Sequence, residues 1–254
     1  NGKTHVLKLL KNLYGQKQAG RVWAQFLIKG LKQIGFKQSA IDECLFYCGT
    51  MLFVVYVDDG IFAGPDPAKI DKAIKELDDI GYDLEDKGDL NDYLGVNVET
   101  LTDGRIKLTQ PHLIDQVVRM VNLPLRSQGK QTPAASSKIL HRDEEEQPFD
   151  YSFNYRGVVG KLNFLENSTR LDIAYATHQV ARHSQDPKQS HGEAIQWLCR
   201  YLRDTRDEGL ILDPTSEKSL EVFADADFCG NWLKRTAQHD VSTAKSRTGY
   251  VITL

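Results

Sequence analysis

The 254-residue sequence contains little cysteine, with four residues at positions 44, 48, 199 and 229. Their number and spacing match neither a disulfide framework nor a zinc site, so we expect a reducing compartment. Cys44 and Cys48 flank apolar residues, which favours small buried hydrophobic side chains over metal ligands. No apolar run is long enough to cross a bilayer, which argues against a membrane role. With 41% hydrophobic and 26% charged residues, the composition is typical of a soluble globular protein with room for two domains.

The sequence also lacks an excess of positive charge, since its formal net charge is -3. Nucleic-acid binding through bulk charge is therefore not expected, and any polyanion site must come from local asymmetry. Residues 1–50 hold 8 Lys/Arg and 2 Asp/Glu, whereas residues 51–100 hold 4 and 13. On charge alone, ordinary solvated helix faces explain this asymmetry better than a binding surface does.

The first 81 residues carry alternating strand and helix patterns. They predict strands over residues 5–10, 44–47 and 51–63, the last interrupted by turn residues at Asp58-Asp59-Gly60. We therefore expect the two carboxylates at a hairpin tip. A helix is predicted over residues 18–34, and another between its N-cap Asp66 and Gly81. Their buried stripes are expected to be Trp23, Phe26, Leu27, Leu31 and Ile34 in the first, and Ile70, Ala73, Ile74 and Leu77 in the second.

The remaining sequence predicts one hairpin, several helices and a final strand. The hairpin is expected from residues 93–100 and 105–109, followed by a helix over 111–121. Residues 125–148 lose periodicity, which indicates a linker or a long surface connection and a domain boundary. Further helices are predicted over residues 155–166, 172–183 and 187–203, the last capped by Asp186, and a strand over residues 220–224.

The motif Tyr56-Val57-Asp58-Asp59 is the strongest candidate site. Two adjacent carboxylates at a tight hairpin repel each other, and divalent cations bound there would offset that repulsion. Oxygen ligands suit Mg2+, and a pair of such ions can align a hydroxyl with a phosphate and stabilise the leaving group. An Asp-Asp-Gly sequence by itself is more often a solvated turn, so the motif alone leaves both alternatives open.

A second block gives this motif its context. Leu13-Tyr14-Gly15-Gln16-Lys17-Gln18-Ala19-Gly20-Arg21-Val22-Trp23 resembles the Leu-Tyr-Gly-Leu-Lys-Gln-Ala-Pro-Arg-x-Trp block of copia-type reverse transcriptases, and its spacing to the Asp pair also fits. The resemblance implies that Asp58 and Asp59 are catalytic metal ligands. It implies that the nucleotide pocket is formed by Tyr14, Gly15, Lys17, Gln18 and Tyr56. The sequence departs from the family at Gln16, where Leu is usual, and at Gly20, where Pro is usual.

The resemblance continues towards the C-terminus in the family's order. Tyr93-Leu94-Gly95-Val96 is similar to the region leading into the thumb, and residues 155–165 and 169–174 are similar to the connection. Apolar positions there are expected in the core, and Arg156 and Arg170 are expected on the surface unless a phosphate lies near them. Residues 223–230 and 246–251 resemble the start of a ribonuclease H domain, which implies Asp225 as its first metal ligand and Asp227 as a weaker candidate.

The family resemblance implies an α/β fold: the palm of a right-hand polymerase with a helical thumb and connection, then the start of a ribonuclease H-like α/β domain. The expected division is residues 1–124 for the palm and the start of the thumb, 125–150 for a linker, 151–213 for the helical connection and 214–254 for the N-terminal part of the ribonuclease H-like domain. Residues Leu171, where Pro is usual, and Phe228, where Trp is usual, depart from the pattern.

The implied function is RNA-directed DNA polymerisation within the Pol polyprotein of a retrotransposon, which also serves DNA integration. The implied partners are an RNA template, a DNA primer and deoxynucleoside triphosphates, with Mg2+ or Mn2+ as cofactor and no membrane; no oligomeric state is indicated. A cytoplasmic particle, or the nucleus, is the expected location. Both ends of the sequence look internal, and in this family another palm carboxylate precedes the Leu-Tyr-Gly block, so we expect the 254 residues alone to be inactive.

Two alternatives remain at this level. A decayed or co-opted relic of such an element, binding only nucleic acid or a protein partner, is permitted by the departures at Gly20, Leu171 and Phe228. A stand-alone ribonuclease is weaker, because the further acidic ligands of that domain would lie beyond Leu254.

Overall fold

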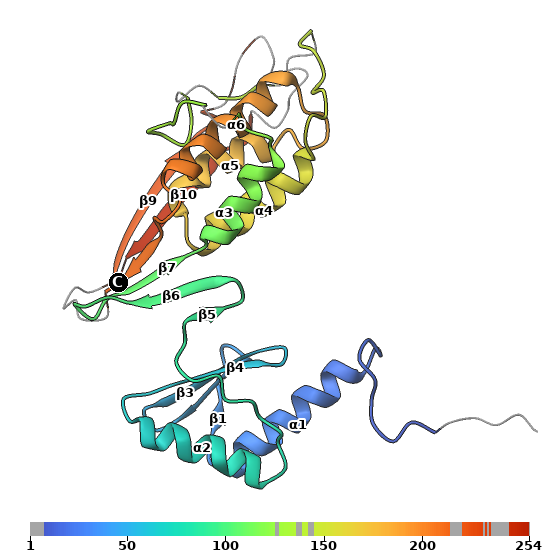
Figure 1. The fold of residues 1–254 in the computed structure, drawn as a ribbon, viewed down its shortest axis with the longest axis vertical. Coiled ribbons are helices and arrows are strands. Elements are labelled where there is room, and N and C mark those ends of the chain that lie inside the picture. The colour runs from blue at the N-terminus through green and yellow to red at the C-terminus, as the bar shows by residue number, and fades with distance from the viewer. Residues whose placement is uncertain are drawn as a thin grey trace, which may run out of the picture. The chain divides into compact units, whose positions relative to one another are not determined.

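The structure is a computed structural model that describes residues 8–124, 127–135, 139–141, 145–213, 220–230, 232, 234 and 244–253 (Figure 1). The chain divides into two compact units, residues 1–90 and 91–254. Both units mix helices with antiparallel strands, which fits the expected α/β class. Within the described ranges, no helix is long and apolar enough to cross a membrane.

The first unit contains a four-stranded antiparallel sheet and two helices (Figure 1). The strands follow one another in sequence order: β1 (Lys37–Gln38), β2 (Leu45–Cys48), β3 (Met51–Tyr56) and β4 (Asp59–Ala63). The helices are α1 (Ala19–Gln33) and α2 (Pro67–Asp79). Both helices were predicted, and the Asp66 carboxylate accepts a hydrogen bond from the Ala68 N–H at 3.1 Å, which confirms the predicted N-cap.

One hydrophobic cluster joins the helices of the first unit to one face of the sheet. Met51 and Phe53 alternate with exposed residues along β3 and pack with Leu31 of α1 and Leu77 of α2. Trp23 is 38% exposed, so the predicted burial of the whole α1 stripe is wrong at its N-terminal end. The hydrophobic contacts are concentrated in the second half of α1, which leaves the first half accessible to polar contacts.

Two smaller predictions in the first unit are wrong. The described residues Lys8–Leu10 do not form the predicted strand, and residues 5–7 lie outside the described part of the chain. Cys44 is exposed and Cys48 only partly buried, because Cys44 precedes β2 and does not share a strand face with Cys48. Cys199, in contrast, is fully buried in the second unit, and burial raises the pKa of its thiol.

The second unit begins with a four-stranded antiparallel sheet whose last strand comes from far along the chain. Its order is β5 (Asp92–Tyr93), β6 (Val96–Thr100), β7 (Ile106–Thr109) and β8 (Leu210–Leu212). The β6–β7 hairpin was predicted, but the single strand over residues 93–100 was not found. Leu94 and Gly95 both have positive φ, at 53° and 77°, which is the pattern of a type I′ turn that reverses the chain between β5 and β6.

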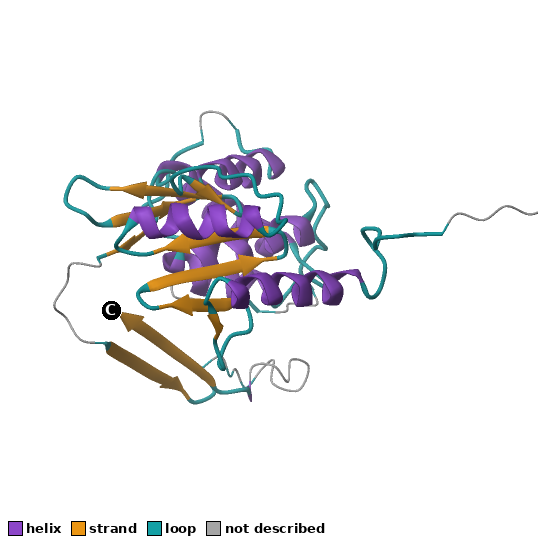
Figure 2. Ribbon diagram, turned by 90° about the horizontal axis from the view of Figure 1, so that it is seen from below, coloured by secondary structure: helices purple, strands orange, loops and turns teal. Residues whose placement is uncertain are grey.

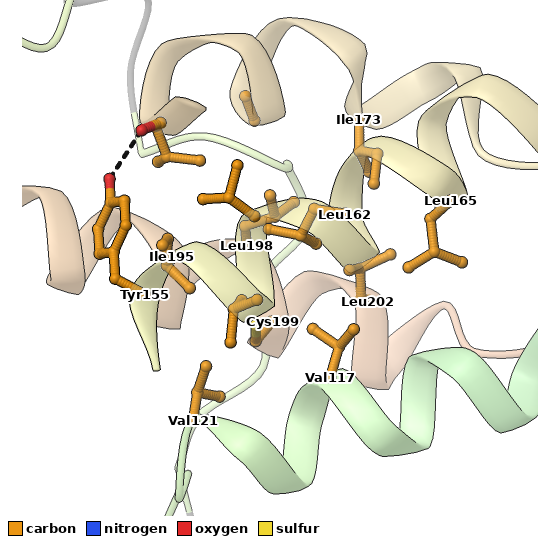
Figure 3. Close-up of a cluster of buried hydrophobic side chains, with 14 of the residues drawn as sticks. Val117, Val121, Tyr155, Leu162, Leu165, Ile173, Ile195, Leu198, Cys199 and Leu202 are labelled. Carbon is orange, nitrogen blue, oxygen red and sulfur yellow. Dashed lines mark hydrogen bonds between the residues drawn. The ribbon is translucent and has the colours of Figure 1, made fainter. Parts of the chain in front are cut away.

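The helices of the second unit enclose its core (Figure 3). They are α3 (Pro111–Met120), α4 (Tyr155–Ser168), α5 (Ala174–Ala181) and α6 (Gln189–Asp204), with a short 3-10 helix at Leu171–Ile173 before α5. Leu162, Leu165, Ile195 and Leu198 are fully buried between them. The buried Tyr155 hydroxyl donates to the Val180 carbonyl at 2.8 Å, which satisfies the polar end of this core residue (Figure 3).

Three local predictions for these helices are wrong. The helix expected over residues 172–183 is shorter, since its start is the 3-10 helix and α5 ends at Ala181. Helix α6 begins after Lys188 rather than Asp186, because the His191 ring nitrogen Nδ1 accepts the Lys188 N–H at 3.0 Å. Arg170, expected on the surface, has a side chain that is 2% exposed and hydrogen-bonds Asp172 and Thr205.

The described parts of residues 127–149 lie along helix α6. Near its C-terminal end, the Arg203 guanidinium donates to the Ser127 carbonyl and hydroxyl, both at 2.8 Å. In the middle, the Trp197 indole N–H donates to the Thr132 carbonyl at 2.9 Å. Near its N-terminal end, the Ser190 hydroxyl donates to the Glu146 carboxylate at 2.8 Å. Of the two alternatives for this stretch, a linker or a long surface connection, these contacts fit the surface connection. The expected division of the chain into domains stays a prediction.

The last described strands form a two-stranded antiparallel ribbon, drawn as two arrows near the C label in Figure 2. They are β9 (Glu221–Asp227) and β10 (Arg247–Thr253). Strand β9 begins one residue after the start of the strand predicted over residues 220–224 and extends beyond its end, because its pairing with β10 continues to Asp227 opposite Arg247.

Candidate active site

The Asp58–Asp59 motif lies at the tip of the β3–β4 hairpin. Tyr56 pairs with Asp59, so Val57 and Asp58 form the two-residue turn, and Asp59 and Gly60 already belong to β4. The predicted turn at Asp58-Asp59-Gly60 is therefore displaced towards Val57. Val57 has φ of 59°, and positive φ at the first turn residue alone is the pattern of a type II′ turn, in which Gly is preferred.

Both carboxylates at this tip are exposed. Among the described residues, neither one has a hydrogen bond or an ion pair, and no group of three His, Cys, Asp or Glu side chains forms a metal site. Two adjacent, unneutralised oxygen donors are suitable ligands for Mg2+, which commonly takes one or two protein carboxylates and completes its shell with water and substrate phosphates. The chemistry of Asp58 and Asp59 thus fits the expected ion.

Close packing supports the hairpin behind the carboxylates. A Cβ at Gly60 would meet the Phe53 ring at 2.6 Å, so only glycine leaves room for that buried ring. The Phe53 ring also lies 4.5 Å from the Phe62 ring, centroid to centroid. The two strands are therefore fixed to each other by aromatic packing directly below the turn.

Trp23 connects helix α1 to the turn. Its indole N–H donates to the Val57 carbonyl at 2.8 Å. Its ring lies 6.2 Å from that of Phe26, which stacks on Tyr82 at 4.3 Å. Sequence reasoning placed Trp23 only in the core stripe of the helix. The sequence did offer a signal. The indole N–H of Trp23 is a polar group that needs a partner, and Trp23 lies near the N-terminal end of α1, next to the Leu-Tyr-Gly block.

Four of the five predicted nucleotide-pocket residues precede α1, and the fifth, Tyr56, ends β3. Gly15 has φ of 86° in a turn where the Gln16 N–H donates to the Leu13 carbonyl at 3.2 Å. Tyr14 is 98% exposed, and Gln18, the N-cap residue of α1, donates to the Asn12 side chain. In this part of the described chain, no hydrogen bond joins Tyr14, Gly15, Lys17 or Gln18 to Tyr56 or the Asp pair. Tyr56 itself is 57% exposed beside the turn.

The two acidic residues predicted for a ribonuclease H site lie on β9. Asp225 pairs with Gly249 inside this strand, which runs on to Asp227 in a two-stranded ribbon. Both side chains belong to the second unit. Asp225 is exposed, and the Asp227 carboxylate lies over Gly230, where a Cβ would meet its Oδ1 at 2.1 Å.

Comparison with known proteins gives a consistent result. A family described as "Reverse transcriptase (RNA-dependent DNA polymerase)" matches residues 1–136. The chain is 31% identical to the retrovirus-related Pol polyprotein from transposon TNT 1-94 of Nicotiana tabacum, over 99% of this chain and 19% of the relative. It is 31% identical to the Pol polyprotein from transposon RE1 of Arabidopsis thaliana, over 98% of this chain and 16% of the relative. A transposon Ty5-1 protein of Saccharomyces cerevisiae is 31% identical over 87% of this chain and 72% of its own length. No solved structure matches.

The chain belongs to the reverse transcriptase (RNA-dependent DNA polymerase) family. Within that family it resembles the Pol polyproteins of copia-type retrotransposons, which confirms the resemblance carried by its motifs. The chain spans less than a fifth of the first two relatives, at 19% and 16% of their lengths.

Proposed function

We propose that this chain carries the catalytic Asp pair of a retrotransposon reverse transcriptase, an RNA-directed DNA polymerase that extends a DNA primer on an RNA template. One observation supports the proposal most directly: Asp58 and Asp59 are adjacent, exposed and without a neutralising partner among the described residues, in a chain that belongs to this family. Mg2+ or Mn2+ held by these carboxylates would supply Lewis-acid chemistry in a two-metal nucleotidyl transfer.

The other predicted residues have roles in this proposal that follow from their chemistry. Gly15 has no side chain and no neighbouring atom within 4 Å of the place where a Cβ would be, so its backbone is accessible to a triphosphate, and Lys17 supplies a positive charge. Tyr14, Gln18 and Tyr56 would contact the sugar and base of a deoxynucleoside triphosphate. Contacts to template and primer should be mainly to the backbone, because a copying enzyme cannot depend on base identity, and affinity should fall with salt.

The proposal extends to the C-terminal part of the chain. We propose Asp225 as the first metal ligand of a ribonuclease H-like domain of the same polyprotein, since its carboxylate is exposed on β9 within the matching motif. The proposed division of the chain is that given under the sequence analysis, with the helical connection at residues 151–213. A cytoplasmic retrotransposon particle is the location that suits this function.

The isolated chain should not extend a primer. Within the described residues, the Asp58–Asp59 tip gathers no third acidic ligand, and an incompletely held metal pair would lose several kcal/mol of transition-state stabilisation. Magnesium-dependent extension by the purified 254 residues that Asp58→Asn abolishes would overturn this expectation.

A chimera tests the function itself. The corresponding segment of an active copia-type Pol polyprotein would be replaced by this chain, and Mg2+-dependent primer extension on an RNA template measured. Asp58→Asn and Asp59→Asn should each lower the rate by about 10³-fold, the loss expected for a ligand worth several kcal/mol. Asp71→Asn, which removes an exposed carboxylate from α2, should leave the rate unchanged.

The outcomes separate the hypotheses. An active chimera that retains its rate with Asp58→Asn would contradict the assignment of the catalytic pair. A folded chimera that is inactive even with both aspartates present would favour a relic that binds nucleic acid or a protein partner without catalysis.

A further inference from the structure

We propose that Trp23 is a positioning residue for the catalytic hairpin, which selects one orientation of the peptide group between Val57 and Asp58 through its indole N–H. The inference rests on the proposed function, because it matters for catalysis only if Asp58 is a metal ligand. It starts from the 2.8 Å hydrogen bond between Trp23 Nε1 and the Val57 carbonyl oxygen.

The turn at Val57 needs external support. Its φ of 59° is in a region that a β-branched side chain rarely adopts, and such a conformation persists only where surrounding contacts enforce it. Tyr56 pairs with Asp59, so the register of the hairpin permits only two residues in the turn. A strained valine is therefore held at the position where type II′ turns prefer glycine.

The orientation of one peptide group distinguishes the two turn types that suit a two-residue hairpin. In type I′ both central residues have positive φ, whereas in type II′ only the first one does, and a flip of the central peptide interconverts them. The carbonyl of that peptide is the Val57 C=O, the acceptor of Trp23. Because the peptide is planar, fixing this carbonyl also fixes the N–H of Asp58 and the direction in which its Cα leaves the turn.

The part of α1 that carries Trp23 packs against Tyr82. Its neighbour on α1, Phe26, stacks on the Tyr82 ring with the centroids 4.3 Å apart, and the Tyr82 hydroxyl donates to the Phe26 carbonyl. The Tyr82 ring, 5% exposed, lies in the space that the absent side chain of Gly30 leaves on α1. The indole therefore extends from a helix that Tyr82, a residue outside the hairpin, also holds in place.

A purely structural role explains less. The Trp23 side chain is 38% exposed and lies outside the buried cluster of the first unit, so it is not part of the core that holds the unit together. Trp23→Phe keeps most of the ring and removes the N–H. Trp197→Phe is a matched control, because Trp197 also donates its indole N–H to a backbone carbonyl, that of Thr132 at 2.9 Å, but in the second unit.

The first test is NMR spectroscopy of the full 254-residue chain, which contains three tryptophans. The Trp23 indole N–H, assigned through Trp23→Phe, should exchange with water about tenfold more slowly than a free indole. Trp23→Phe should shift or broaden the amide signals of Val57, Asp58 and Asp59, and Trp197→Phe should not. An indole N–H of Trp23 that exchanges freely, or hairpin amides that Trp23→Phe leaves unchanged, would overturn the inference.

The second test uses the chimera and separates kcat from KM. Trp23→Phe should lower kcat by about five- to tenfold, the size of one hydrogen bond, and change the KM for deoxynucleotides by less than about twofold. In a Val57→Gly background the same change should lower kcat by less than about twofold, because glycine adopts the turn without support. An equal loss in both backgrounds would contradict the proposed mechanism.

These results also distinguish the two proposals. If Asp58→Asn leaves the chimera active, the proposed function fails, and the NMR experiment still reports whether Trp23 fixes the turn. If Asp58→Asn abolishes activity while Trp23→Phe changes neither kcat nor the hairpin amides, only the positioning role of Trp23 fails.

Discussion

The buried ion pair between Arg170 and Asp172 predicts an unequal response to loss of its two partners. The Arg170 side chain is 2% exposed, whereas that of Asp172 is 40% exposed. The guanidinium donates two hydrogen bonds to the carboxylate, at 2.9 and 2.8 Å, and two to Thr205, at 2.9 and 2.7 Å. Asp172 also accepts the Tyr201 hydroxyl at 2.7 Å. The charge that cannot reach water is that of the arginine.

The magnitudes follow from this difference in exposure. Asp172→Asn leaves a buried guanidinium without its counter-charge, and a buried charge stripped of its partner typically costs about 3–5 kcal/mol. Arg170→Met leaves a carboxylate that keeps the Tyr201 hydroxyl and gains water, so about 1–3 kcal/mol is expected for the lost hydrogen bonds. Asp172→Asn should therefore be the more destabilising of the two substitutions.

The assay is urea unfolding of the full chain. Unfolding is monitored through hydrogen exchange of the α6 amides, so that only the second unit is observed. The Asp115–Arg206 pair provides a control with similar geometry, since both hydrogen bonds are 2.8 Å long but the side chains are 36% and 37% exposed. Asp115→Asn should cost less than about 1 kcal/mol. The reasoning fails if Asp172→Asn costs no more than Arg170→Met, or no more than the exposed control.

Three further predictions concern single positions. Gly30→Ala, whose Cβ would overlap the Tyr82 ring, should destabilise the first unit by about 1–3 kcal/mol. Gly20→Ala in the same helix meets no atom within 4 Å and should stabilise the unit by about 0.5–1 kcal/mol. Thermal unfolding would show the two opposite effects, and equal effects would refute the clash. Burial lowers the pKa of His191 below 6.5, against the raising effect of its backbone hydrogen bond, so its contribution to stability is present above pH 6.5 and is lost as the pH falls through the folded-state pKa. Urea midpoints of the second unit between pH 5 and 8 should show this fall, and His191→Gln should flatten it. Asp66→Ala should destabilise α2 by about 1 kcal/mol in urea unfolding, whereas Asp66→Asn, which keeps the capping oxygen, should cost only a few tenths.

The parts of the fold that depend on local sequence were predictable. Helices α1, α2 and α3 follow from apolar periodicity within one segment, and the Asp66 cap follows from residues that are neighbours in sequence. The β3–β4 hairpin was also predicted, because two strand patterns flank turn-forming residues. In each case the determining contacts lie within a few residues of one another.

The features that were missed depend on contacts between distant residues. Arg170 is buried because Thr205, at the end of α6, accepts two of its hydrogen bonds, and no local pattern indicates this. The hydrogen bond between Trp23 and Val57 likewise joins segments that are 34 residues apart. The turn position was missed because pairing of Tyr56 with Asp59 outweighs the local preference of Asp58-Asp59-Gly60 for turns.

The late arrival of β8 has a consequence for the synthesis of this protein. Ile106 of β7 pairs with Leu212 of β8, so the sheet cannot be completed until the ribosome has made all of the helices between them. At about 5–20 residues per second, that interval lasts on the order of 5 to 20 seconds. During this time β7 presents an open edge that could pair with another nascent chain. Helices α3 to α6 are therefore all synthesised before the sheet can close, and a chaperone that shields the β7 edge during elongation should raise the yield of folded protein.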